Sequence, residues 1–510
     1  MQQPSPEHEA AGAAELDALV QLASDIEGML PSSDTGLDHW RAQAEKLREA
    51  GALGTLAGER ALDDLGWSLR GAWLRCAFET SCDYLMSPPH EQPKNLPSGR
   101  SFQFDYERSS RPESLEARGA SLFPAPDEWT GHCMLFSSGM SALATLFQVC
   151  CARLRGPTPD QPVQLDMFGG YFETWRLLDT VHDSVLKVTY LESPRQLEQR
   201  VAEGKTDVMV VEPVAYDWDM TVFDLDGFAA AWRQAGNERP RLVIVDTSLT
   251  ADRFTMDDLL PAFGDQLPWM VAFVRSGLKL DQQGLELSNV GIVNLYVPQG
   301  EASPIHFERL KERLTVNRAI TGGALTVNQT AALEAPWFLR GEALGRHAAR
   351  VFENNSILAR SVRLEGGIFS SIKHPALSDD EKTTPWSVSP FVVMHVNDDS
   401  ISRLGKLVAI LVHEIKTRGL CVDLASSFGF RGHRFEVIRP LVQIREHEAS
   451  SGLLKIAMGS RSGPSIQGVV DLINEIAAYA DWDALVAAYP DVRAYAKGGF
   501  GVYVARPPRP

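Results

Sequence analysis

The sequence has few cysteines and no long apolar run. Its N-terminus also lacks a basic segment followed by an apolar one. Its six cysteines form no C-x-x-C pair, the spacing of many metal and redox sites. No apolar stretch reaches the about 20 residues of a membrane-spanning helix, and "MQQPSPEHEAAGAAELDALV" lacks the regions of a signal peptide. We therefore expect a cytoplasmic protein with no membrane partner, no metal site and reduced, buried thiols, Cys150 and Cys151 among them.

Positive charge is also scarce. There are 66 Asp and Glu residues against 49 Lys and Arg residues, which gives a formal net charge of −17 at pH 7, and no long basic run occurs. Such a chain repels nucleic acid and anionic membranes. The remaining composition, 44% hydrophobic and 23% charged, is that of a globular protein of two or three domains, and we expect a small molecule as its partner.

Several well-known catalytic motifs are missing from the chain. It contains no G-x-S-x-G, no G-x-x-x-x-G-K-[ST], no H-E-x-x-H, and no G-x-G-x-x-G after an apolar run. A nucleophile-elbow hydrolase, a P-loop nucleotidase, a zinc protease and a dinucleotide-binding enzyme are therefore disfavoured.

The apolar pattern changes along the chain. Apolar residues recur at helical spacing from Leu16 to Ile26 and helical patterns continue to about residue 80, followed by a Pro- and Ser-rich linker, "MSPPHEQPKNLPSGR",. Short continuous apolar runs then alternate with helical segments: "VMVVEPV", "RLVIVDTS", "WMVAFV" and "VGIVNLYV". Continuous apolar runs indicate strands that are covered on both faces, and hence a mainly parallel sheet between helices.

Three regions follow from these changes. We expect an N-terminal helical extension with its linker over residues 1–95, a large α/β domain over 96–325, and a smaller C-terminal α+β domain over 326–510.

The segment "PWMVAFVRSGLKLDQQG" places Lys279 between two leucines, shortly after a buried strand. A lysine in an apolar pocket has a lowered pKa and is suited to be a base or a Schiff-base nucleophile, although a lysine that extends from a strand end to solvent is the common alternative. Asp246 ends the apolar run "LVIV". Ligands of such sheets bind beyond the carboxyl ends of the strands, so the two side chains are candidates for one site.

An amine that forms an imine, with a carboxylate that keeps a heteroaromatic nitrogen protonated, is the minimal set for pyridoxal 5'-phosphate. Its phosphate needs backbone amides at the start of a helix. The segment "MLFSSGMSALATLF" offers them in Ser138, Gly139 and Met140, between a strand and an apolar helix. A plain helix cap is the alternative for this turn.

These residues, with those between them, resemble the cystathionine γ-synthase family, the Cys/Met-metabolism group of fold-type I pyridoxal-phosphate enzymes. The resemblance is distant, runs from about Phe104 to the region of Ile476, and marks an atypical member. Its motifs are "YERSSRPESLE" (Y-x-R-x-x-N-P), "FSSGM" (S-S-G-M), "MFGGYFETW" (Y-G-G-T), "VVEPVAYD" (E-x-P-x-N-P), "IVDTSLT" (V-D-N-T-F) and "RSGLK" (S-x-T-K).

The resemblance implies a role for each matched residue. Lys279 would be the Schiff-base lysine, Ser276 a phosphate ligand, and Phe168 the ring that stacks on the cofactor. Tyr106 and Arg108 would reach the phosphate of the neighbouring subunit, which implies a homodimer or a dimer of dimers. The amides of Gly139 and Met140 would bind the phosphate.

The departures from the family pattern are equally specific. Tyr216 replaces an Asn that contacts the ring hydroxyl, and Leu278 replaces a phosphate-binding Thr. Lys455, in "KIAMG", stands where the family has the Arg that binds the substrate carboxylate. Lysine is a point charge without the guanidinium fork. Arginines of "FGFRGHR" and "GSRSG" are therefore alternative ligands of the carboxylate: Arg431, Arg434 and Arg461.

The implied activity is γ-replacement or γ-elimination on an amino acid with a leaving group at Cγ, through a vinylglycine-type quinonoid. Lys279 would be the base at the α-carbon, and Asp246 would keep the ring an electron sink. Because Phe168 cannot donate a proton, a leaving group that needs none is favoured, such as the sulfonium of S-adenosylmethionine. This suggests a natural-product enzyme that uses S-adenosylmethionine for C–C bond formation or annulation, for example onto a pyridinium such as a nicotinamide nucleotide.

Two further possibilities remain at this point. An aminotransferase would use the same cofactor and lysine. A non-catalytic binding protein on the same fold is suggested by the substitutions at Tyr216, Leu278 and Lys455, and an intact Lys279 and Asp246 argue against it.

Overall fold

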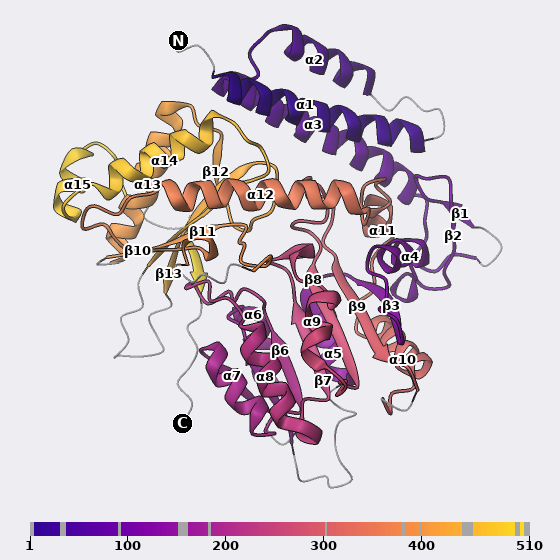
Figure 1. The fold of residues 1–510 in the computed structure, drawn as a ribbon. Coiled ribbons are helices and arrows are strands. Elements are labelled where there is room, and N and C mark those ends of the chain that lie inside the picture. The colour runs from indigo at the N-terminus through magenta and orange to yellow at the C-terminus, as the bar shows by residue number, and fades with distance from the viewer. Residues whose placement is uncertain are drawn as a thin grey trace.

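The computed structural model describes residues 5–30, 37–89, 93–150, 162–181, 185–300, 303–378, 384–397, 400–440, 452–494 and 500–503. The N-terminal region forms three helices, as predicted, and they lie together along one side of the molecule (Figure 1). The side chains of Ser5 and Thr55 accept hydrogen bonds from backbone amides in the first turn of the helix that each precedes, which is the usual N-cap. The three helices are α1 (Pro6–Met29), α2 (Leu37–Glu49) and α3 (Leu56–Ser81).

These helices share a hydrophobic core with the rest of the chain. Leu16, Leu69 and Trp73 are fully buried in one cluster with Ile292 and Phe338. The Trp73 indole donates to the backbone oxygen of Ala332 at 2.8 Å. The domain boundary near residue 95 stays a proposal, because α1 and α3 have no core separate from that of the later residues.

The large sheet has seven strands in the order β3-β9-β8-β7-β6-β4-β5. Only β9 runs antiparallel to its neighbours, so the predicted mainly parallel sheet is confirmed. The four apolar runs named above form β6 to β9. The strands are β3 (Trp129–Phe136), β4 (Val163–Phe168), β5 (Leu186–Leu191), β6 (Val208–Val211), β7 (Leu242–Asp246), β8 (Met270–Ser276) and β9 (Gly291–Pro298).

Helices cover both faces of this sheet, which explains why its strands are continuously apolar. Along β4 the side chains alternate: Met167 joins the core under α5, whereas Phe168 joins the core of the opposite face. The first face carries α5 (Gly139–Cys150), α6 (Phe172–Asp179) and α10 (Phe307–Ile320), and the second carries α7 (Pro194–Ala202), α8 (Leu225–Ala235) and α9 (Met256–Phe263).

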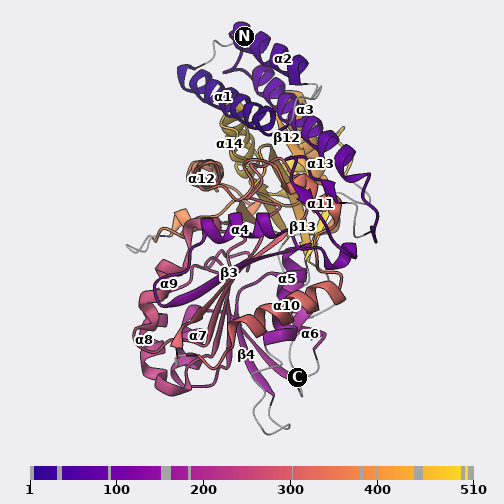
Figure 2. The ribbon, with the colours of Figure 1, turned by 90° about the vertical axis from the view of Figure 1, so that its right-hand side faces the viewer.

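The C-terminal region is a second, smaller unit of sheet and helices, which lies between the N-terminal helices and the large sheet in Figure 2. Its sheet has the order β10-β11-β14-β13-β12, and β15 pairs with β13. The elements are α11 (Val327–Leu333), α12 (Gly341–Ser361), β10 (Phe369–Lys373), β11 (Val392–Val396), α13 (Ile401–Arg418), β12 (Val422–Leu424), β13 (His433–Pro440), β14 (Leu453–Ala457), α14 (Pro464–Ala477), α15 (Trp482–Ala488) and β15 (Phe500–Tyr503). The boundary near residue 325 precedes α11 and stays a proposal.

Two short segments join the N-terminal helices to the large sheet. The predicted linker contains one strand of a two-stranded hairpin. The helix that follows the hairpin packs on the second half of β3, where Glu116 accepts a hydrogen bond from the Leu135 amide. These elements are β1 (Lys94–Asn95), β2 (Ser101–Phe102) and α4 (Glu113–Leu122).

The cysteines of the described residues are all free. Cys133 and Cys150 are buried, but Cys82 is exposed, so the prediction of buried thiols holds only in part, and Cys151 lies outside the described residues. No helix among the described ranges is both long enough and apolar enough to span a bilayer.

Candidate active site

A cavity of about 240 Å³ lies beyond the carboxyl ends of the central strands. This edge is where ligands of parallel sheets bind. The structure brings together here side chains from five connections that are far apart in the sequence. The cavity is lined by Ser138, Gly139, Met140, Leu143, Tyr171, Glu173, Glu212, Tyr216, Asp246, Ser248, Leu249, Val274, Arg275, Ser276, Leu278, Lys279 and Asn289.

The amine of Lys279 lies inside this cavity, three residues after β8. Its Nζ is 4.3 Å from the centre of the Phe428 ring and 5.7 Å from that of Tyr171. Burial lowers the pKa of Lys279 to about 8, although the charge of Asp246 raises it, and the charge of Lys455 lowers it further. A part of the amine is therefore neutral near neutral pH, as a nucleophile or base requires.

The carboxylate of Asp246 faces the same cavity from the last position of β7. It accepts a hydrogen bond from the Ser248 amide at 2.9 Å. Burial raises the pKa of Asp246, and the Ser248 hydrogen bonds and the charge of Lys279 act against this rise. The two residues that the sequence placed at separate strand ends thus line one cavity.

The start of α5, which is the predicted phosphate cradle, also lines the cavity with Ser138, Gly139 and Met140. The Ser138 hydroxyl accepts a hydrogen bond from the Ser141 amide at 3.1 Å. A Cβ atom added to Gly139 would lie 3.5 Å from Ser276, so Ser276 faces the helix start directly. Backbone amides at a helix N-terminus favour an anion, and these residues can hold a phosphate group.

The predicted position of Phe168 is wrong. This ring is 1% exposed and packs in the core of the sheet face that α7, α8 and α9 cover, 6.3 Å from the Phe223 ring. Tyr171, three residues later, lines the cavity instead. The segment "YFET" repeats the Y-x-x-T spacing of the family motif from Tyr171 to Thr174, so an alignment shifted by three residues also fits the two ends of the motif.

Glu212 fixes the Tyr171 turn and was not predicted as a site residue. Its carboxylate accepts hydrogen bonds from the amides of Gly170 at 3.0 Å, Tyr171 at 3.1 Å and Tyr216 at 2.7 Å. Burial and the charge of Asp246 raise its pKa to about 7, against the three backbone hydrogen bonds. The glutamate that follows β6 therefore positions both tyrosines at the cavity.

The Tyr171 hydroxyl donates to a Glu173 carboxylate oxygen at 2.7 Å. Burial, this hydrogen bond and the charge of Glu173 raise the pKa of Tyr171. The phenol stays protonated over the physiological range and can donate a proton in the cavity.

Tyr216 lines the cavity, as predicted, and connects it to Lys455. The Lys455 amine lies 3.5 Å from the Tyr216 hydroxyl and forms an ion pair with Glu436 on the neighbouring strand β13. Lys455 is 3% exposed. Burial lowers its pKa, but Tyr216 and Glu436 raise it by more, so the net shift of the pKa is upward and the amine stays charged.

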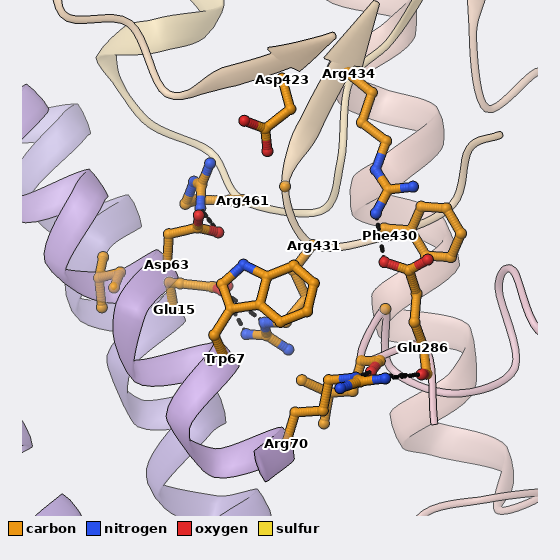
Figure 3. Close-up of a pocket in the computed structure, with 15 residues that line it drawn as sticks. Glu15, Asp63, Trp67, Arg70, Glu286, Asp423, Phe430, Arg431, Arg434 and Arg461 are labelled. Atoms are coloured by element: carbon orange, nitrogen blue, oxygen red, sulfur yellow. Dashed lines mark hydrogen bonds and ion pairs between the residues drawn. The ribbon is translucent and has the colours of Figure 1, made fainter. Parts of the chain in front are cut away.

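The three arginines proposed as carboxylate ligands are not in the cavity. Arg431 pairs with Glu15, and Arg461 pairs with Glu59 and Asp63. Arg434 pairs with Glu286 and stacks on the Phe430 ring at 3.9 Å. All three line a different, small cavity between the N-terminal helices and the C-terminal sheet (Figure 3). The prediction that Arg431, Arg434 or Arg461 binds the substrate carboxylate is therefore wrong.

Tyr106 and Arg108 lie at the surface, outside the cavity. The Tyr106 side chain is 53% exposed, and the Arg108 guanidinium lies 5.3 Å from its ring centre. Their role toward a neighbouring subunit stays a prediction.

We expect Tyr171→Ala and Phe168→Ala to fail in different ways. Loss of the Tyr171 ring should weaken pyridoxal phosphate binding by about tenfold, which is the contribution of one stacked ring, about 1.4 kcal/mol. Loss of the buried Phe168 ring should lower the free energy of unfolding by about 3 to 5 kcal/mol with little effect on binding. Cofactor titration and urea unfolding measure the two quantities, and the opposite pattern would restore Phe168 to the site.

The fold is that of fold-type I pyridoxal-phosphate enzymes, a mainly parallel seven-stranded sheet between helices with a smaller C-terminal α+β layer. Apo CalE6, a methionine gamma lyase from Micromonospora echinospora, matches with a TM-score of 0.52 at 17% identity, over 74% of this chain and 89% of that one. Cystathionine gamma synthase from Xanthomonas oryzae pv. oryzae, in complex with cystathionine, matches with a TM-score of 0.51 at 16% identity, over 79% and 98%. The complex of the same synthase with aminoacrylate and cysteine matches with a TM-score of 0.51 at 16% identity, over 81% of this chain and 98% of that one. No family model and no curated protein sequence matches the chain.

Proposed function

We propose that the chain is a pyridoxal-phosphate-dependent enzyme that eliminates or replaces a group at Cγ of an amino acid. The observation that carries this proposal is the meeting of Lys279, Asp246 and the start of α5 in one cavity. An amine, a carboxylate and an anion cradle are the groups that this cofactor needs. The likeness in fold to a methionine gamma lyase and a cystathionine gamma synthase supports the reaction class.

The bound cofactor would supply an electron sink for a substrate carbanion. Lys279 would hold the cofactor and would remove the proton from Cα of the substrate, because a pKa of about 8 keeps part of the amine neutral,. Asp246 would keep the ring nitrogen protonated, and Ser138, Gly139, Met140 and Ser276 would bind the phosphate at the helix start.

Tyr171 has two functions in this proposal. Its ring would cover the cofactor, and its protonated hydroxyl would donate a proton to the leaving group at Cγ. The preference for a sulfonium, which needs no proton, depended on a phenylalanine at this place. Because Tyr171 offers a protonated hydroxyl in the cavity, a sulfonium is no longer favoured over other leaving groups. Leaving groups that need a proton, such as thiols, are equally compatible with the cavity.

The substrate carboxylate must meet a cation other than the three arginines rejected above. Arg275 lines the cavity and is paired with Asp281 at 2.6 Å, and Lys455 is likewise paired with Glu436. We propose Lys455, because it stands at the position of the family's carboxylate-binding arginine, keeps its charge and contacts the hydroxyl of Tyr216, which lines the cavity. Tyr106 and Arg108 complete the phosphate site of a second subunit in a homodimer, and the mass of the protein in solution tests this part.

The test is incubation with methionine, cystathionine and S-adenosylmethionine in deuterated water. We expect exchange of the α and β protons of at least one substrate, because removal of a β proton distinguishes γ-chemistry from transamination. Accumulation of pyridoxamine phosphate with an amino acid alone would favour an aminotransferase. A colourless protein that takes up no cofactor would contradict the proposal and favour the non-catalytic alternative.

A further inference from the structure

The loop of residues 425–432, between β12 and β13, links the active-site lysine to the N-terminal helices. At one end the Phe428 ring, 2% exposed, lies 4.3 Å from the Lys279 amine and 5.2 Å from the Phe391 ring. Three residues later, Arg431 points to the opposite side, into the small cavity of Figure 3. We call this segment the roof loop.

The backbone of the roof loop is fixed between these two ends. Gly429 has φ +80°, and a Cβ atom there would lie 3.0 Å from the side chain of Leu280, the residue after Lys279. The ring of His347, on α12, donates to the backbone oxygen of Gly429 at 2.9 Å. The turn that joins Phe428 to Arg431 is therefore short and closely packed.

Arg431 is held by α1. Its Nε donates to Glu15 Oε1 at 3.0 Å, its Nη2 pairs with the same carboxylate, and Glu15 also lies 3.5 Å from Arg350 on α12. Glu15 and Arg431 are 3% and 8% exposed. Burial raises the pKa of Glu15, but the adjacent arginines lower it by more. Removing one partner would leave a buried charge without compensation.

The N-terminal helices also hold the segment that follows Lys279. The Arg70 side chain, on α3, donates to the backbone oxygens of Leu285 at 2.8 Å and Glu286 at 2.9 Å (Figure 3). The Arg431 amide donates to the Gly284 oxygen at 3.4 Å, and a Cβ atom on Gly284 would lie 2.4 Å from that amide nitrogen. The two segments that enclose the lysine are thus packed on each other and anchored to α1 and α3.

This region is an anchor and not a second ligand site. Its cavity measures only about 30 Å³, the volume of about one water molecule. Each of its four arginines already has a protein partner, so no cation is left for an anionic ligand: Arg70, Arg431, Arg434 and Arg461.

We propose that the N-terminal helices position Phe428 over the Lys279 amine, with Glu15 as the positioning residue that holds the roof loop through Arg431. The ring excludes water from the amine, which disfavours the charged form, whereas the face of the ring attracts a cation,. We take the loss of hydration to be the larger of the two effects on the pKa of Lys279. The charged groups that act on Lys279 from the other walls, Asp246, Lys455, Glu173 and Glu212, are untouched by this anchor. The inference rests on the proposed function only where cofactor capture is the readout.

The variant Glu15→Gln tests the proposal, with Glu27→Gln as its matched control. Glu27 is on the same helix and also pairs with an arginine, Arg41, but on the side of α2. Amide hydrogen exchange of peptides that contain residues 425–432 should become at least about tenfold faster in Glu15→Gln and stay unchanged in Glu27→Gln. Arg431→Met should give the same increase, and the double variant no further increase.

The second readout is the pH profile of pyridoxal phosphate capture by the cofactor-free full chain. In Glu15→Gln the midpoint should rise from about 8 by about one unit, so that capture at pH 7 slows about tenfold. Glu15→Asp, which keeps the charge, should restore most of the rate. Phe428→Ala, which leaves the ion pair intact and removes the cover of the amine, should raise the midpoint by a similar amount.

Several outcomes would overturn the inference. Unchanged exchange in Glu15→Gln would show that the ion pair does not hold the roof loop. Faster exchange with an unmoved midpoint would show that the loop does not shield the amine. If Glu15→Gln does not fold, an unmoved midpoint in Phe428→Ala is equally decisive. Failure of the wild type to capture the cofactor would refute the proposed function instead, and the exchange experiment would still decide on the anchor.

Discussion

Replacement of Lys279 by alanine is expected to abolish covalent capture of pyridoxal phosphate and to lower γ-elimination by at least about 10³-fold. The variant loses both the group that binds the cofactor and the base at Cα, and a positioned base alone contributes about 10²- to 10⁴-fold. Borohydride reduction of the wild type should fix the cofactor on the peptide that contains Lys279, as mass spectrometry detects. The alanine variant should carry none.

The control for this experiment is Lys187→Ala, an exposed lysine of β5. It should keep both the activity and the labelled peptide. The assignment of Lys279 fails if the alanine variant is still labelled at another lysine and is still active, because the essential amine would then lie elsewhere. Addition of a small primary amine, which can replace the missing base, should restore a part of the activity to Lys279→Ala.

The Asp246→Asn variant is expected to bind the cofactor covalently and still lose about 10²- to 10³-fold in kcat, the usual effect of removing one preorganised electrostatic partner of a transition state. The amide cannot keep a proton on the ring nitrogen, so the carbanion at Cα is less stabilised. Because Lys279 remains, labelling by borohydride should be unchanged. This separation of binding from turnover distinguishes a role in catalysis from a role in folding.

Asp483→Asn, at an exposed position in the first turn of α15, is the matched control and should be indistinguishable from the wild type. Slower exchange of the α proton in Asp246→Asn would locate the defect at the carbanion step. Full activity in Asp246→Asn would mean that its carboxylate serves only as the partner of the Ser248 amide.

The structure also explains which predictions failed. Phe168 was placed at the cofactor because it precedes the two glycines that match the Y-G-G-T element of the family. Along β4, Met167 and Phe168 face opposite sides of the sheet, and the buried aromatic core around Phe223 takes the Phe168 ring. The turn that Glu212 fixes then brings Tyr171 to the cavity. Which aromatic residue lines the cavity thus depends on Glu212, which is 41 positions from Tyr171 in the sequence. A local motif does not include so distant a residue.

The sequence by itself determined the parallel sheet, the position of Asp246 at the end of β7 and of Lys279 shortly after β8, and the Ser-Gly turn before α5. Each of these follows from a local pattern, because continuous apolar runs require cover on both faces and strand ends carry the functional groups. Only the tertiary structure decided with which carboxylates Arg431 and Arg461 form ion pairs. Arg431 is separated from Glu15 by 416 positions, and Arg461 from Glu59 by 402. A buried guanidinium pairs with whichever carboxylate the packing of α1 and α3 brings to it, and that packing is a property of the whole chain.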